Sequence, residues 1–282
     1  MTAFVWVRSP RALLVIVWLA AGIGPHLAIA QDARRPVKVE FEASPPRPDP
    51  LMLVGYLRRP ERPGPSPAVV LLHGCDGSWR GIDRRWGTRL QSWGYVTLAV
   101  DSYGPRGITN TCSVPIGDDT LDGYAALNFL ADQTYLDGNK VALLGTSRGG
   151  GLTLTSVEQG AFERLSKTKF KAAVALYPPC VGDSGLVTIP TLVLIGASDE
   201  GTPAEDCRDM AGGHGSIGVS RAPGDRSNLH LIVYPGAYHS FDNDGLQRGM
   251  CYFGHWVEYN EAATQDSVDQ VRKFLRTELG GQ

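Results

Sequence analysis

The sequence lacks the usual signs of a metal site. None of its five cysteines stands in a CxxC pair, and no cluster of histidine and cysteine has the spacing of zinc ligands. It also lacks an excess of charge of one sign, because 27 basic residues face 29 acidic ones. Removing residues 1–30 takes away Arg8 and Arg11 and no acidic residue, so the formal net charge falls from −2 to −4. This weak acidity argues against nucleic acid or an anionic surface as a partner.

The apolar run near the N-terminus is also short for a membrane-spanning helix. Arg8 and Arg11 precede an apolar run over Ala12–Ala21, and glycines, Pro25 and a histidine interrupt the apolar character after it. Ala28-Ile29-Ala30 has the small residues of a cleavage site. The pattern indicates a secretory signal peptide over residues 1–30, with a retained anchor as the alternative. We expect a secreted protein, in a bacterial periplasm or outside the cell, with no stable membrane span after cleavage.

Residues 31–50 contain five prolines, which favours an extended N-terminal segment. The remaining residues, 51–282, suit one α/β domain. Short apolar runs that read as strands alternate with helical patterns, so we expect a mostly parallel sheet of about eight strands with helices on both faces. The runs cover residues 37–41, 51–56, 68–72, 95–100, 141–144, 172–177, 191–195 and 231–234. Only 13 residues, 178–190, separate two of these strands, which leaves no room for a lid domain there, so we expect an open pocket.

One serine stands at the centre of a strand–turn–helix pattern. The run Val141–Leu144 reads as a buried strand, Gly145-Thr146-Ser147-Arg148-Gly149 follows it, and a helical pattern resumes at Leu152. Glycines two places before and after the serine let helix and strand approach closely, as in a nucleophile elbow. The alternative is a glycine-rich turn that only packs a helix on a strand. We take Ser147 as the candidate nucleophile.

Two further polar residues follow later strands, in the order that α/β-hydrolases use. Asp199 comes directly after the strand at 191–195, and His239 follows the strand at 231–234. A serine hydroxyl needs a base to take its proton, which His239 would do, while Asp199 would orient the imidazole. Glu200 and Asp206 remain alternatives for the acid. His230 is a weaker candidate base, because it begins a strand, and His255 reads as a surface or packing residue.

The loop after the strand at 68–72 is the candidate oxyanion hole. In hydrolases with a serine elbow, this loop supplies one backbone N–H and the residue after the nucleophile supplies the other. Here these are the N–H groups of Cys75 and Arg148. His73 in the same loop reads more readily as a hydrogen-bonded core histidine.

A second polar loop follows the strand at 95–100. Its Arg106 is a candidate for holding a substrate carboxylate, against the alternative of a solvated arginine, and Tyr103 is a second candidate binding residue. Export would allow disulfides, and an odd count leaves at least one thiol free or paired between chains. Cys180 and Cys207 follow consecutive strands, so we expect this pair to be the first to form a disulfide.

These motifs, taken in order, resemble the dienelactone hydrolase family. The resemblance rests on His73-Gly74-Cys75-Asp76-Gly77, the run from Asp101 to Gly107, the elbow at Gly145–Gly150, Gly196–Asp199 and Tyr238–Phe241, and it covers residues 50–278. It implies a lidless α/β-hydrolase fold and cofactor-free hydrolysis of an ester or lactone. The founding enzymes carry a cysteine in the elbow where this chain has Ser147, so a serine carboxylesterase acting on a small-molecule ester is expected. A peptidase, a polysaccharide deacetylase and a non-catalytic binding protein on the same fold are the alternatives.

Overall fold

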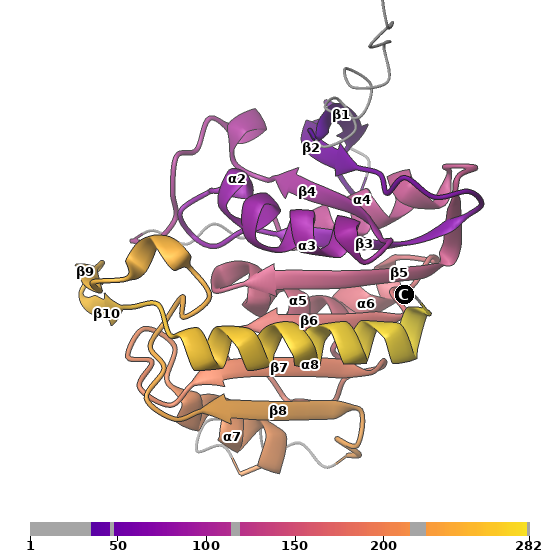
Figure 1. Ribbon diagram of the computed structural model, residues 1–282. Coiled ribbons are helices and arrows are strands. Elements are labelled where there is room, and N and C mark those ends of the chain that lie inside the picture. The colour runs from indigo at the N-terminus through magenta and orange to yellow at the C-terminus, as the bar shows by residue number, and fades with distance from the viewer. Residues whose placement is uncertain (1–34, 46–47, 114–118, 215–223, 281–282) are drawn as a thin grey trace, which may run out of the picture.

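An eight-stranded sheet forms the centre of the molecule in the computed structural model, which describes residues 35–45, 48–113, 119–214 and 224–280 (Figure 1). The strand order is β1-β2-β4-β3-β5-β6-β7-β8. β1 and β2 run antiparallel to their neighbours and the other strands are parallel. The strands are β1 (Val37–Glu42), β2 (Met52–Arg58), β3 (Ser66–Leu72), β4 (Val96–Asp101), β5 (Leu136–Thr146), β6 (Ala172–Leu176), β7 (Thr191–Gly196) and β8 (Leu229–Tyr234). This confirms the predicted fold class.

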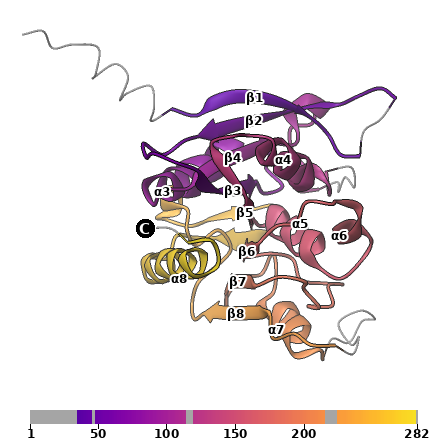
Figure 2. The same ribbon diagram turned by 90° about the vertical axis from the view of Figure 1, so that its right-hand side faces the viewer.

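Helices cover both faces of the sheet (Figure 2). One face carries a composite helix and the C-terminal helix α8 (Glu261–Leu279). The composite helix consists of α2 (Trp79–Ile82), the π-turn η1 (Asp83–Gly87) and α3 (Thr88–Ser92). The opposite face carries α4 (Asp122–Ala131), α5 (Arg148–Val157), α6 (Ala161–Leu165) and α7 (Ala204–Gly212). The short helices η2 (Gly104–Arg106) and η4 (Asp244–Leu246) lie in loops.

The core lies on both faces of the parallel strands, because helices leave no face of these strands to water. Every residue of β3, β6 and β7 is buried. The apolar runs that mark these strands in the sequence are therefore continuous rather than alternating. β1, at the edge of the sheet, exposes several of its side chains.

Two features differ from the sequence-based expectation. The sequence pattern of residues 83–93 predicts a helix from Asp83, but the helix begins earlier, at Trp79, because the Ser78 side chain accepts a hydrogen bond from the Gly81 N–H and caps it. A two-stranded hairpin, β9 (Met250–Tyr252) and β10 (His255–Val257), follows the last sheet strand and was not anticipated. The proposed signal peptide, residues 1–30, lies outside the described residues. Among the described helices none is long and apolar enough to cross a bilayer.

Candidate active site

The elbow serine occupies a strained turn between β5 and α5. Ser147 has φ 53° and ψ −123°, a backbone conformation that residues other than glycine rarely adopt. The flanking glycines are required by contact: a Cβ at Gly145 would lie 2.0 Å from the Gly149 carbonyl oxygen, and one at Gly149 would lie 2.2 Å from the Leu72 carbonyl oxygen. The close approach of α5 to the sheet therefore excludes any side chain at either position.

Three polar side chains from separate loops meet at this turn. His239 Nε2 lies 3.0 Å from the Ser147 hydroxyl oxygen, and His239 Nδ1 lies 2.7 Å from Asp199 Oδ2. Asp199 and His239 are buried, with 5% and 6% of their surfaces exposed. All three residues follow the carboxyl ends of parallel strands, β5, β7 and β8, which meet at one edge of the sheet. The structure thus brings together the three residues that the sequence predicts.

The carboxylate of Asp199 is held by the turn that follows it. Its Oδ1 accepts hydrogen bonds from the backbone N–H groups of Gly201 (2.9 Å) and Thr202 (2.8 Å). The Thr202 hydroxyl lies 2.9 Å from Asp199 Oδ2 and 3.1 Å from the Tyr177 carbonyl oxygen. These contacts fix one oxygen of Asp199 toward His239 Nδ1. Sequence reasoning missed Thr202, although the spacing Asp-x-x-Thr after a strand was a usable signal for this turn.

The rival candidates for acid and base lie elsewhere. Glu200 is exposed, and Asp206 lies in α7. His230 is exposed on β8. His255, on β10, lines the pocket beside Ser147, and its ring centre lies 5.3 Å from that of His239. Its interpretation as a surface or packing residue therefore missed that it belongs to the site. Burial, followed by the neighbouring His239, lowers the pKa of His255 below its ordinary value.

The candidate oxyanion loop lies directly across from the serine. A Cβ at Gly74 would lie 3.4 Å from the Ser147 Cβ, and Cys75 lines the same pocket. Arg148 is the first residue of α5, where backbone N–H groups have no acceptor within the helix. His73 is buried in the core as expected: its Nε2 accepts from the Ser102 N–H, so Nδ1 carries the proton toward the Gly74 carbonyl. Burial lowers the pKa of His73.

The two candidate binding residues of the second loop do not line the pocket. The Arg106 guanidinium is 7% exposed and makes two hydrogen bonds, 2.8 and 2.9 Å long, to the Asp122 carboxylate. Both interpretations of Arg106 made from the sequence, a substrate ligand and a solvated side chain, are therefore corrected. Tyr103 is 2% exposed, and its hydroxyl contacts the Thr111 hydroxyl at 2.5 Å. Both residues fasten their own loop to the body of the domain.

The cleft beside Ser147 is small, with a volume of ≈ 90 Å³, and polar side chains and aromatic rings line it. Its lining contains no aliphatic or phenylalanine side chain. The lining residues are Gly74, Cys75, Asp76, Ser78, Arg85, Thr146, Ser147, Tyr177, His239, Ser240, Asn243, Tyr252 and His255. In the described part of the chain no group of three or more His, Cys, Asp or Glu residues is arranged to hold a metal ion.

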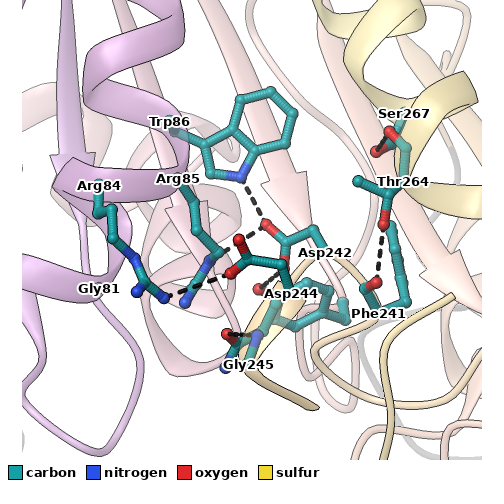
Figure 3. A network of polar contacts seen from close by, with 12 residues as sticks. Gly81, Arg84, Arg85, Trp86, Phe241, Asp242, Asp244, Gly245, Thr264 and Ser267 are labelled. Carbon is teal, nitrogen blue, oxygen red and sulfur yellow. Dashed lines mark hydrogen bonds and ion pairs between the residues drawn. The ribbon is translucent and has the colours of Figure 1, made fainter. Parts of the chain in front are cut away.

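A buried network supports the loop that carries His239 (Figure 3). Asp242, three residues further on, accepts hydrogen bonds from the Trp86 indole N–H and the Tyr177 hydroxyl, each 2.7 Å long. Arg85 Nε lies 3.4 Å from the same carboxylate. Burial is the largest single effect and disfavours the charged form of Arg85, but Asp242, Tyr177 and Asp76 together outweigh it and raise the arginine pKa. The Tyr177 ring packs edge-on against His239 at 4.9 Å, so the network reaches the candidate base.

Two disulfides lie within the described residues. Cys180–Cys207 joins the loop after β6 to α7, as the sequence predicts, and Cys75–Cys112 joins the candidate oxyanion loop to the loop after η2. The second pair was not predicted, because Cys112 lies in a loop whose position no pattern fixes. Cys251, on the hairpin, is a free and exposed thiol.

Comparison with known proteins identifies a family whose model matches most of the chain. The model described as "Dienelactone hydrolase family" matches residues 53–279. A dienelactone hydrolase-like promiscuous phosphotriesterase, P91 from metagenomic libraries, is 22% identical with a TM-score of 0.63, and the match covers 87% of this chain and all of that one. Esterase 2 of Thermogutta terrifontis, solved after phosphoramylation by tabun, is 19% identical with a TM-score of 0.60, covering 84% and 94% of the two chains.

A curated relative matches over a shorter stretch. It is a protein of Emericella nidulans described as probable dipeptidyl-aminopeptidase B, 33% identical over 119 residues. The match covers 38% of this chain, which spans only 13% of the length of that relative.

Proposed function

The chain belongs to the dienelactone hydrolase family and is a serine hydrolase of the esterase type, and on that premise we propose that it cleaves a small, polar carboxylic ester or lactone with Ser147, His239 and Asp199. The observation that carries the proposal is the unbroken chain of contacts from the Ser147 hydroxyl through His239 to Asp199. A neutral hydroxyl, an imidazole and a buried carboxylate in this order are what acyl transfer requires.

In the proposed reaction the Ser147 oxygen attacks the ester carbonyl carbon while His239 Nε2 takes the hydroxyl proton. Asp199 keeps the Nδ1 proton on the far side of the ring and stabilises the imidazolium that forms. The carbonyl oxygen becomes an oxyanion, which the backbone N–H groups of Cys75 and Arg148 receive. His239 then gives its proton to the leaving alcohol, which departs and leaves an acyl-enzyme.

The second half of the reaction uses the same groups with water in place of the serine. His239 removes a proton from water, the resulting hydroxide attacks the acyl carbon, and the Ser147 oxygen leaves with that proton. In a lactone the leaving alcohol stays attached to the acyl group, so the product is a single hydroxy acid. Neither half requires a cofactor.

The pocket lining supports a short and polar substrate. A volume of ≈ 90 Å³ holds a few non-hydrogen atoms, and no aliphatic wall is present to bury a fatty chain. Each methylene group that stays in water misses about 0.8 kcal/mol of the favourable free energy that its burial would give. We therefore expect kcat/KM for p-nitrophenyl esters to be highest for acetyl and to fall steadily toward octanoyl.

Export is the second part of the proposal. The pattern at residues 1–30 has the three regions of a signal peptide. Cys75–Cys112 and Cys180–Cys207 are bonds that persist in oxidising compartments, which supports the same interpretation. Expression of the full chain with an epitope tag, followed by fractionation and N-terminal sequencing, should give a mature protein that starts at Gln31.

A fluorophosphonate probe tests the nucleophile and separates an enzyme from a binding protein. The wild type should be labelled at one site, and Ser147→Ala should abolish labelling and ester hydrolysis without loss of the fold. Ser198→Ala, in the turn before Asp199, is a control that keeps a serine substitution near the site and should leave labelling intact. Labelling that survives Ser147→Ala would contradict the assignment.

A second candidate function is a peptidase, favoured by the similarity of part of the chain to a protein described as a dipeptidyl-aminopeptidase. Aminoacyl and dipeptidyl p-nitroanilides measured beside the ester series separate the two. An esterase should hydrolyse the acetyl ester far faster than any of these amides, because an amide nitrogen is a poorer leaving group.

A further inference from the structure

The candidate oxyanion loop is a tight turn whose two central carbonyl groups are both bound. The Gly74 carbonyl accepts from His73 Nδ1–H (2.8 Å) and from the Gly77 N–H (3.2 Å). The Cys75 carbonyl accepts from the Thr111 N–H at 2.8 Å. These bonds fix the peptide groups on both sides of Cys75.

The direction of the Cys75 N–H follows from the planarity of its peptide. In a trans peptide the C=O and the N–H point to opposite sides. The Gly74 carbonyl is tied back to His73 and Gly77, so the Cys75 N–H points the other way. Cys75 lines the cleft beside Ser147.

The remaining freedom of Cys75 is removed by a covalent bond to Cys112. We infer that the Cys75–Cys112 disulfide is a positioning device for the oxyanion hole, and that hydrolysis by this protein therefore depends on the redox state of that one bond. This inference rests on the proposed function. It assigns to Cys112, which lies outside the pocket lining, a role exerted through Cys75.

The loop that carries Cys112 is built as a firm support. Arg106 at its start is bound to the buried Asp122 carboxylate, and the Tyr103 hydroxyl contacts Thr111. A Cβ at Gly77 would lie 3.0 Å from the Thr109 carbonyl oxygen, so the two loops are in contact. The bond thus ties the oxyanion loop to a segment that is itself anchored in the core.

Reduction breaks this support by a balanced exchange. Dithiothreitol gives up two electrons and two protons and closes to a cyclic disulfide, while the sulfur–sulfur bond opens to two cysteine thiols. Cys75 and Cys112 are both half-buried, so a small reductant has access to the bond. Reoxidation by oxidised glutathione reverses the exchange.

The second disulfide provides a matched control. Cys180–Cys207 closes a loop of 27 residues against 37 for Cys75–Cys112, and the contribution of a disulfide to stability varies only slowly with loop length. Two variants, Cys75→Ser/Cys112→Ser and Cys180→Ser/Cys207→Ser, are made in a Cys251→Ser background, which removes the free thiol. Hydrolysis of p-nitrophenyl acetate, urea unfolding and inhibition by methylboronic acid are measured for each.

We expect Cys75→Ser/Cys112→Ser to lower kcat about 10- to 100-fold with KM within threefold, since removing one oxyanion donor outright costs about 10²–10³ in kcat. Its affinity for the boronic acid, whose tetrahedral adduct occupies the oxyanion hole, should fall in proportion. The Cys180→Ser/Cys207→Ser variant should lose similar stability but keep kcat within threefold. Near-normal kcat in the first variant, or equal losses in both, would overturn the inference.

A reduction experiment decides the matter if the first variant does not fold. The Cys251→Ser protein, treated with dithiothreitol while its far-UV circular dichroism stays unchanged, should lose activity and regain it on reoxidation. The Cys180→Ser/Cys207→Ser protein should remain equally sensitive. Full activity with free Cys75 and Cys112 thiols, shown by mass spectrometry after alkylation, would refute the inference. Failure of the proposed function looks different: the oxidised protein would then show neither ester hydrolysis nor labelling at Ser147.

Discussion

Two aspartates in the loop after His239 allow a sharp test of the buried network. Asp242 is fully buried, accepts hydrogen bonds from Trp86 and Tyr177 and forms an ion pair with Arg85, whereas Asp244 pairs with Arg84 at the surface (Figure 3). The two carboxylates are two residues apart, so the same substitution, Asp to Asn, compares burial at nearly constant position.

The losses in the free energy of unfolding that we expect for the two variants differ by about a factor of ten. Asp242→Asn leaves the Arg85 guanidinium, only 14% exposed, without a counterion and turns one acceptor oxygen into a donor that faces other donors. Breaking a buried ion pair costs about 3–5 kcal/mol, and we expect a loss in that range in the free energy of unfolding. In the Arg84–Asp244 pair the side chains are 66% and 72% exposed, so Asp244→Asn should change that free energy by less than about 0.5 kcal/mol.

Urea unfolding at pH 7, followed by far-UV circular dichroism, measures both variants. The Tyr177 hydroxyl loses its acceptor in Asp242→Asn, and the Tyr177 ring packs on His239, so kcat should fall as well. A loss below about 1 kcal/mol for Asp242→Asn, or an equal loss for Asp244→Asn, would refute the argument that burial makes this network stabilising.

Three further predictions concern single residues. Burial, with a smaller contribution from Glu158, raises the pKa of Asp183 to about 8. The folded chain then holds a proton that the unfolded chain releases near pH 4, so stability should fall as pH rises from about 4 to 8. Asp183→Asn should make the melting temperature depend less on pH over this range. Gly149→Ala should prevent folding or cost more than about 3 kcal/mol, because its Cβ would lie 2.2 and 2.5 Å from two backbone carbonyl oxygens. In Gly151→Ala the Cβ would crowd the Pro179 ring at 2.8 Å and meet the Pro179 carbonyl oxygen only at 3.5 Å, so this variant should cost less by urea unfolding. Asp199→Asn should lower kcat about 10⁴-fold with the fold intact, while Glu200→Gln stays within threefold in the same ester assay; the reverse result would move the acid to Glu200.

The sheet and the proximity of the Ser147, Asp199 and His239 side chains could be predicted from the sequence, because both follow from patterns of neighbouring residues. Buried parallel strands appear as continuous apolar runs, and the residue after each run necessarily lies at the carboxyl edge of the sheet. Ser147, Asp199 and His239 all lie within five residues of the end of such a run. The Cys180–Cys207 pairing follows from the same reasoning, since both cysteines come after consecutive strands.

The features that escaped prediction depend on contacts between loops. Arg106 pairs with Asp122, sixteen positions later, across a loop whose course no pattern specifies. Cys75 and Cys112 are joined for the same unpredictable reason. The hairpin formed by β9 and β10 has strands of three residues each, too short to show alternation, and so the place of His255 in the pocket was missed.

The backbone that carries His239, the candidate base, is joined to the hairpin formed by β9 and β10. This link limits which changes in the hairpin could alter specificity without also moving His239. A parallel bridge joins His239 to Val257 at the end of the hairpin, and the Phe241 carbonyl accepts from the Thr264 hydroxyl of α8 at 2.8 Å. The base is therefore held by the segment that follows it as well as by β8. An insertion in the hairpin would shift the pocket wall and His239 together, so it should lower kcat. A side-chain change at Tyr252 leaves these backbone contacts in place and should act on KM.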